Sequence, residues 1–218
     1  MLEIPVVNSA LIPISVFALV IVVLIWATAV TGKRSAENMR QLADKLGLQA
    51  AISPPTWGIF YPQVRAGGTF RDKVVEVFPF STGSGKSRVQ WCAISAAARR
   101  SGGLTFVFRK QGFGTKVMEM FGAHEIEVGD PAFDREWFIQ TNQPDFMRAA
   151  LVPELRTRLT GLARESGARG PQLQLEGGVV RYAEQGTFSN PVRCGHIASA
   201  AALVCDFVDL AEVFGEQA

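Results

Sequence analysis

A run of about twenty residues near the start of the chain, Leu11 to Val30, contains no charged side chain. A helix of this length spans about 30 Å, which is the thickness of the hydrocarbon core of a bilayer. Pro13 lies in the first turn, where a missing N–H costs little, and Trp26 lies near the other end, where an indole reaches the headgroups. The run therefore predicts a transmembrane helix over residues 11–30, preceded by a short external segment, residues 1–10.

A cleaved signal peptide is the alternative interpretation of this run. Ala27-Thr28-Ala29 has the small side chains of a cleavage site. A signal peptide also needs a basic segment before a shorter apolar core, and Met1 to Ala10 carries only Glu3. The flanking residues therefore favour an anchor that stays in the mature protein.

Basic residues follow the apolar run, and none precedes it. By the positive-inside rule, this asymmetry places the N-terminus outside and residues 31–218 in the cytoplasm of a bacterial cell, with the helix in the inner membrane. Trp26, Lys33 and Arg34 are the predicted membrane-interface residues, and membrane lipids are the first predicted partner.

The composition of the whole chain limits the classes of protein it can belong to. With 48% hydrophobic residues the chain is too apolar to be disordered, and its 218 residues suit one domain besides the anchor. The 22 Lys and Arg residues against 20 Asp and Glu give a net charge of +2, which provides no electrostatic basis for binding nucleic acid.

Periodicity predicts an α+β fold: an N-terminal transmembrane helix followed by a cytoplasmic domain of antiparallel strands packed with two or three helices. A juxtamembrane helix, Ala36 to Leu46 with Gly47 as its stop, and a linker occupy residues 31–52, and the α+β domain occupies residues 53–218. The predicted strands are Thr69 to Phe80, Lys86 to Ser95, Leu104 to Lys110, Trp137 to Gln140 and a hairpin over residues 172–184; the predicted helices are residues 152–167 and 190–214.

Two segments are candidates for binding a partner. The proline-rich segment Ser53 to Gln63 is either a strand with core aromatics or a binding loop that presents Trp57, Phe60 and Tyr61. The last helix is apolar over most of its circumference, so it is either central to its own core or covered by another chain. Its candidate contact residues are Leu203, Phe207, Leu210 and Phe214.

Motifs that suggest chemistry are incomplete. Gly85-Lys86-Ser87 resembles the end of a phosphate-binding loop, but Phe80 replaces the first glycine and a strand follows, so we expect a hairpin loop. Cys194 and His196 lie about 200° apart on a helix and do not face each other. The chain has two histidines and no paired cysteine motif, so we predict no catalytic residue, cofactor or metal site. Cys92, Cys194 and Cys205 are expected to be buried thiols.

One stretch, Gly129 to Leu162, resembles a group of uncharacterised bacterial single-pass membrane-anchored proteins with a cytoplasmic α+β domain. The similarity is carried by an Asp-Pro-x-Phe turn at Asp130, a strand at Phe138-Ile139, a short helix from Phe146 and a Leu-x-Pro-x-Leu helix start at Leu151. Upstream, residues 42–48 and 67–77 are similar as well. The resemblance implies an α+β domain of unknown activity on a membrane anchor, with no catalytic residue to transfer.

These observations favour a non-catalytic, single-pass accessory subunit of a larger bacterial membrane complex, such as a respiratory or photosynthetic one, with other integral membrane subunits as partners in a hetero-oligomer. A hydrolase-like enzyme at the membrane surface is an alternative, and it requires a pocket lined by at least two of Glu125, Glu127, Asp130, Cys194 and His196. A lipid-binding or sensor module that uses Lys33, Arg34 and the aromatic loop is another.

Overall fold

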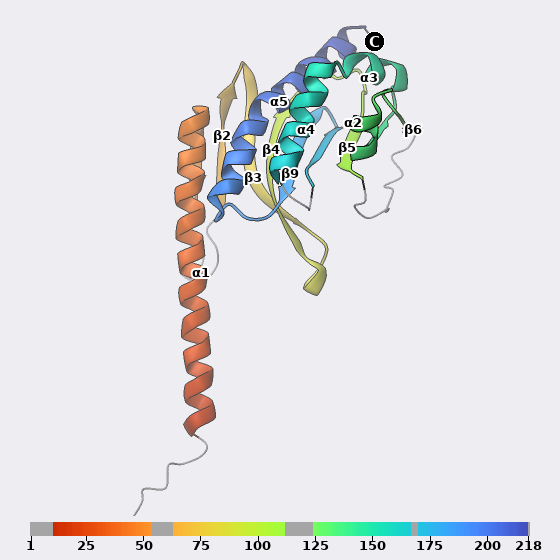
Figure 1. Ribbon diagram of the computed structural model, residues 1–218. Helices are drawn as coiled ribbons and strands as arrows, with labels where there is room; N and C mark the ends of the chain where they lie inside the picture. Colours follow the sequence, from red (N-terminus) through yellow and green to blue (C-terminus); the bar gives the residue numbers. More distant parts are fainter. Residues whose placement is uncertain (1–10, 54–62, 112–123, 167–169, 218) are drawn as a thin grey trace, which may run out of the picture.

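The computed structural model describes residues 11–53, 63–111, 124–166 and 170–217. In these residues the chain forms an α+β fold with one antiparallel sheet and helices packed on it (Figure 1). The strand order is β1-β2-β3-β4-β9-β8-β5-β7-β6. The strands are β1 Gln49–Ile52, β2 Val64–Phe70, β3 Lys73–Thr82, β4 Val89–Ala97, β5 Phe106–Lys110, β6 His124–Glu125, β7 Trp137–Thr141, β8 Gln172–Glu176 and β9 Val179–Gln185.

Five α-helices complete the described fold: α1 Leu11–Leu46, α2 Pro131–Glu136, α3 Pro144–Ala150, α4 Pro153–Ser166 and α5 Pro191–Gln217. α5 crosses strands β4 and β9 and contacts both α1 and α4 (Figure 1). The core lies between these helices and the sheet face lined by alternate residues such as Val75, Ile94 and Tyr182. The predicted class, antiparallel strands packed with helices behind an N-terminal apolar helix, is confirmed.

The predicted strand Thr69 to Phe80 is wrong, because the chain turns back in the middle of it. Arg71 and Asp72 have φ values of 48° and 60°, and Phe70 pairs with Lys73 across this two-residue turn. Two successive positive φ values are the signature of the tight turn that matches the twist of a hairpin. Glycine and asparagine usually occupy such positions, and neither is present here. Without such a marker, the alternating pattern on both sides of the turn indicates one continuous strand.

The first helix is also longer than predicted. The expected transmembrane and juxtamembrane helices are one continuous element, α1, which runs from Leu11 to Leu46. Gly47, at φ 68°, ends it as predicted, and the amide of Leu48 donates to the carbonyl of Ala43 over 2.8 Å. The last third of α1 belongs to the core, since Met39 and Leu42 are buried there. Residues 36–52 are therefore part of the folded domain rather than a linker, and β1 is an edge strand of the sheet.

α5 is covered by its own chain. Leu203 and Phe207 are buried, and the Phe207 ring lies 5.4 Å from Phe106 and 5.5 Å from Phe108, centroid to centroid. This location corrects the prediction that Leu203 and Phe207 bind a partner. The unusual apolarity of the helix follows from its central position, since it packs on the sheet, on α1 and on α4.

Candidate functional site

The most exposed apolar surface of the described chain is the first half of α1. Ten of the fifteen large hydrophobic side chains that are exposed lie between Val16 and Trp26, and they are 40–69% accessible. In Figure 1 this half of the helix extends away from the domain. Within the described residues, α1 is the helix that is long and apolar enough to cross a membrane. The orientation of the helix in the membrane stays a prediction.

Polar groups near the end of this apolar half are satisfied within the helix. The hydroxyl of Thr28 donates to the carbonyl of Ile25 and that of Thr31 to the carbonyl of Ala27, each over 2.8 Å. A hydroxyl bonded in this way does not need water, so it is compatible with the edge of a bilayer. Trp26, Lys33 and Arg34, the predicted interface residues, all have exposed side chains around this junction. From Ala36 onward one face of the helix is buried by the domain.

A cavity of about 190 Å³ lies at the junction where α1 meets the domain. Its walls mix apolar surface with neutral hydroxyl and amide groups and contain no charged residue. The lining residues are Thr31, Gly32 and Ser35 of α1, Val64, Pro79 and Gln90 of the sheet, and Thr187 and Phe188 before α5. Such a lining suits a neutral polar group attached to an apolar one.

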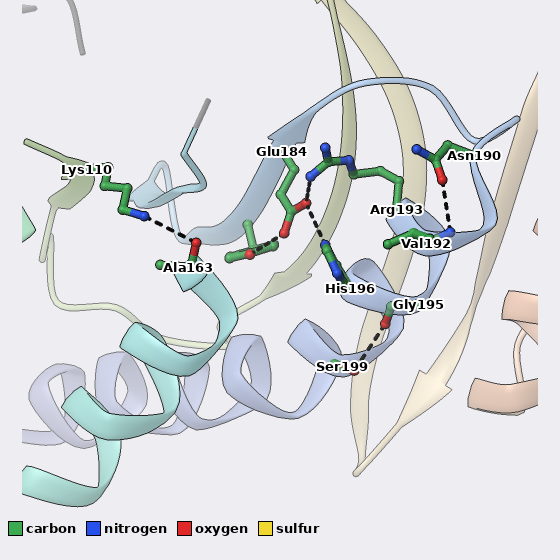
Figure 2. A network of polar contacts seen from close by, with 10 residues as sticks. Lys110, Ala163, Glu184, Asn190, Val192, Arg193, Gly195, His196 and Ser199 are labelled. Atoms are coloured by element: carbon green, nitrogen blue, oxygen red, sulfur yellow. Dashed lines mark hydrogen bonds and ion pairs between the residues drawn. The ribbon is translucent and has the colours of Figure 1, made fainter. Parts of the chain in front are cut away.

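A buried polar network joins β9 to the start of α5 (Figure 2). Glu184 is fully buried; the hydroxyl of Tyr182 donates to its Oε1 over 2.6 Å, and Arg193 donates a short hydrogen bond to its Oε2. His196 Nδ1 lies 3.3 Å from the same Oε2. Arg193 and His196 are three residues apart, so both project from one side of α5 toward β9. A buried carboxylate needs such partners, and here they fasten the helix to the sheet.

The cysteines belong to packing rather than to this network. Cys194 Sγ donates to the carbonyl of Phe188 over 3.4 Å, whereas His196 faces Glu184, so the two side chains point to different partners as predicted. Burial raises the pKa of the Cys194 thiol to about 11 and raises the pKa of Cys92 still further. Cys92, Cys194 and Cys205 are all buried and free, which confirms the prediction. Protonated, buried thiols are poor nucleophiles at neutral pH.

The carboxylates considered for catalysis do not converge. Glu125 and Glu127 are exposed, and Glu125 lies on β6, the last strand of the sheet order. Asp130 caps α2 by accepting from the amides of Ala132 and Phe133, and it pairs with Arg156 over 3.1 Å. Asp130 lines a cavity of about 330 Å³ and Cys194 one of about 170 Å³. Among the described residues, neither cavity includes a second member of the set that the hydrolase hypothesis requires.

The structure describes only some of the residues that were predicted to bind a partner. Trp57, Phe60 and Tyr61 lie outside the described residues. On α5, Leu210 and Phe214 are half-buried against the core, and the Phe214 ring lies 4.8 Å from that of Phe146. The apolar surface of α5 is therefore used largely within the chain.

Sequence reasoning missed two features of this region. The Glu184 network gave no signal, because a glutamate at the end of an alternating strand normally faces water. The Gly-Lys-Ser segment is a hairpin loop, as expected, but the length of the hairpin was not foreseen: β3 and β4 continue well past the rest of the sheet (Figure 1). The loop carries Lys86 and Arg88, both exposed.

Comparisons with known proteins give one informative match. No protein-family model matches the sequence, and no curated protein does. Among solved structures, the crystal structure of the mycobacterial trehalose monomycolate transport factor A, TtfA, is similar, with a TM-score of 0.53 and 11% sequence identity. The similarity covers 82% of this chain and 95% of that one. At this identity the likeness concerns the fold, so the chain has a TtfA-like α+β fold with an apolar N-terminal helix.

Proposed function

We propose that this chain is a non-catalytic, single-pass accessory subunit of a bacterial membrane complex that moves lipids. In this proposal α1 spans the inner membrane, and the α+β domain lies at the cytoplasmic surface. One observation carries the proposal: a single unbroken helix has an uncovered apolar half and a half that is built into the domain core. A domain fixed in this way to a membrane rod is suited to hold its position beside other membrane subunits.

A membrane location is supported by the free energy that it would cost to leave the first half of α1 in water. Ten large apolar side chains of α1 would face water in a soluble protein, and moving each from water to an apolar environment is worth about 1–2 kcal/mol. The bilayer removes this cost without any further protein contact. Transmembrane helices of partner subunits would bury the same side chains by packing against α1.

The support for a non-catalytic role is the way in which reactive groups are used. Asp130 is committed to a helix cap, Glu184 to an ion-pair network and Cys194 to packing. These assignments give Asp130, Glu184 and Cys194 structural roles, in agreement with an accessory function.

The support for lipid transport comes from the fold and the junction. The TtfA structure, which is similar over most of both chains, carries the name of a transport factor for a glycolipid. In this chain a neutral cavity lies directly beside the point where α1 enters the domain. We therefore favour a lipid-handling host over a respiratory or photosynthetic one, with membrane lipids and integral membrane subunits as partners.

Copurification tests this proposal. The full chain, tagged at its C-terminus and expressed at its native level, is crosslinked in cells, extracted in mild detergent and identified with its partners by mass spectrometry. We expect integral membrane proteins of lipid transport to copurify. A matched chain in which residues 11–30 are replaced by an unrelated transmembrane helix separates partners held by α1 from those held by the domain. A clean monomer in both cases would contradict the proposal.

Orientation has its own test. A protease added outside intact cells is expected to leave the domain whole and to digest it only after the inner membrane is opened. Digestion in intact cells would place the domain outside and overturn the cytoplasmic assignment.

A further inference from the structure

The β3–β4 hairpin extends beyond its neighbours in the sheet. β2 pairs with β3 only as far as Val77, and β9 pairs with β4 only from Trp91 onward. Beyond both points, the ladder of the described residues consists of the pairs Ser81–Gln90 and Thr82–Val89 alone, so the end of the hairpin is a short ribbon of two strands. Figure 1 shows it projecting past the other strands and past α4 and α5.

Side-chain contacts stiffen this ribbon. An isolated two-stranded hairpin is marginally stable in water, so a projecting one needs reinforcement. The Phe80 and Trp91 rings are stacked with centroids 5.9 Å apart, and the Arg181 guanidinium lies 5.1 Å from the Phe80 ring. Trp91 Nε1 donates to the hydroxyl of Thr82 over 2.9 Å. The tip is therefore held at a defined position instead of hanging loosely from the sheet.

The tip carries two positive charges, Lys86 and Arg88. Lys86 and Arg88 are exposed, and no acidic residue occurs between Val77 and Arg100. In the described part of the chain, neither side chain forms an ion pair with an acid. The tip is otherwise built of serine, threonine and glycine, residues that leave the two cations accessible.

The direction of the hairpin matches that of the apolar half of α1. In Figure 1 both elements leave the domain on the same side. Lys33 and Arg34 follow the apolar run on α1, so the same side of the domain carries basic residues on two separate elements. If α1 is in the bilayer, this side faces the membrane surface.

We propose that the hairpin tip is a second membrane contact, in which Lys86 and Arg88 bind the anionic headgroups of phospholipids in the leaflet where α1 ends. The inference rests on the proposed membrane anchoring and adds a specific ligand class to it. Basic side chains near an anionic surface each strengthen binding about fivefold. Together with α1, this second contact fixes the rotation of the domain about the helix axis, which a single anchor does not.

Lipid-to-protein quenching tests the contact in the full chain. A fluorophore is attached at Ser84→Cys, and the chain is reconstituted in nanodiscs that contain headgroup-nitroxide lipid, with either neutral phosphatidylcholine or an admixture of anionic phosphatidylglycerol. The native cysteines are buried and do not compete for the label. We expect strong quenching in anionic discs and weaker quenching in neutral ones. A label at Val213→Cys, an exposed position near the C-terminal end of α5, is expected to stay unquenched with both lipid compositions.

Charge reversal identifies the residues responsible. Lys86→Glu with Arg88→Glu is expected to lower the quenching in anionic discs to or below the neutral-disc level. The matched control, Arg99→Glu with Arg100→Glu, makes the same change in charge at the far end of β4 and is expected to leave it unchanged. No quenching at Ser84→Cys in chains that comigrate with discs, or equal quenching with both lipids, would overturn the hairpin contact. Failure of the chain to comigrate with discs would instead overturn the proposed anchoring.

Discussion

The two halves of α1 belong to one unbroken helix and have different surroundings. Between Val16 and Trp26 the exposed side chains are apolar on every side of the helix. Between Ala36 and Leu46 the apolar residues form one buried stripe, and charged and polar residues occupy the other faces. A uniformly apolar surface is suited to lipid, and a stripe is suited to a protein core. The comparison shows that the distribution of apolar residues around the helix, more than their number, indicates whether lipid or protein surrounds each half.

Acidic residues in the uncovered half are expected to have the largest effect. Val20→Asp together with Val23→Asp is predicted to oppose membrane insertion by about 6 kcal/mol, because each acid at mid-helix costs about 3 kcal/mol. Carbonate extraction should move the chain from the membrane pellet to the supernatant, while circular dichroism reports a folded domain. The control, Val20→Leu with Val23→Leu, should stay in the pellet; equal retention of both variants would contradict a lipid-facing surface.

The buried network on the domain side gives the next largest effect. Glu184→Leu is predicted to lower the free energy of unfolding by about 3–4 kcal/mol, because Arg193 and His196 lose the carboxylate that they share. Chemical denaturation in detergent measures the loss. Glu176→Leu, on an exposed side chain of β8, should change it little. Similar values for the two variants would show that the network does not hold α5 to the sheet.

Truncation in the covered half affects stability and not membrane retention. Met39 is completely buried, and Met39→Ala should cost about 3 kcal/mol through the cavity it leaves. Its neighbour Arg40 is exposed and, among the described residues, pairs only with Glu37, so Arg40→Ala should cost less than about 1 kcal/mol. Thermal denaturation followed by circular dichroism tests both. A Met39→Ala variant as stable as the wild type would mean that this half of α1 is not part of the core.

The smallest effect concerns the ion pairs of α5 with the sheet and depends on pH. Lys73 Nζ lies 2.8 Å from Asp209 Oδ1 and 2.5 Å from Glu212 Oε2. The hydrogen bond from Lys73, followed by that from the Arg99 amide, lowers the pKa of Glu212. Burial alone would lower the pKa of Lys73, but the two carboxylates outweigh it and raise that pKa.

The sign of the pH effect follows from the lowered pKa of Glu212. A carboxylate whose pKa is lower in the folded state stabilises the fold above its ordinary pKa, 4.5 here, and this stability is lost as the pH falls through the folded value. Lys73→Met is predicted to cost about 1–2 kcal/mol at pH 7, and the difference from the wild type should shrink below pH 4.5. Urea denaturation at several pH values measures it, and a difference independent of pH would contradict the pairing.

The helices α4 and α5 were predictable from the sequence because their signals are local. α4 and α5 begin at Pro153 and Pro191, and the apolar patterns that follow them are long. The free thiols and the hairpin at Gly177-Gly178 could also be predicted from the sequence pattern. Each of these features depends on neighbours in the chain.

The features that were missed depend on residues far apart in the sequence. The turn at Arg71 and Asp72 is fixed by the pairing of β2 with β3 and has no glycine to mark it. Glu184 acquires its partners only when α5 packs on β9. The projection of the β3–β4 hairpin is visible only when the lengths of the neighbouring strands are known. No local pattern encodes such relations.

Thiol accessibility along α1 in nanodiscs tests the account most directly. Single cysteines at Val20, Leu24, Glu37 and Arg40, one per chain, are treated with a water-soluble maleimide. We predict that the positions in the first half, Val20 and Leu24, are protected by lipid, whereas Glu37 and Arg40 on the solvent-facing side of the second half react readily. Equal, rapid labelling at all four positions would contradict a helix that passes from the bilayer into the domain.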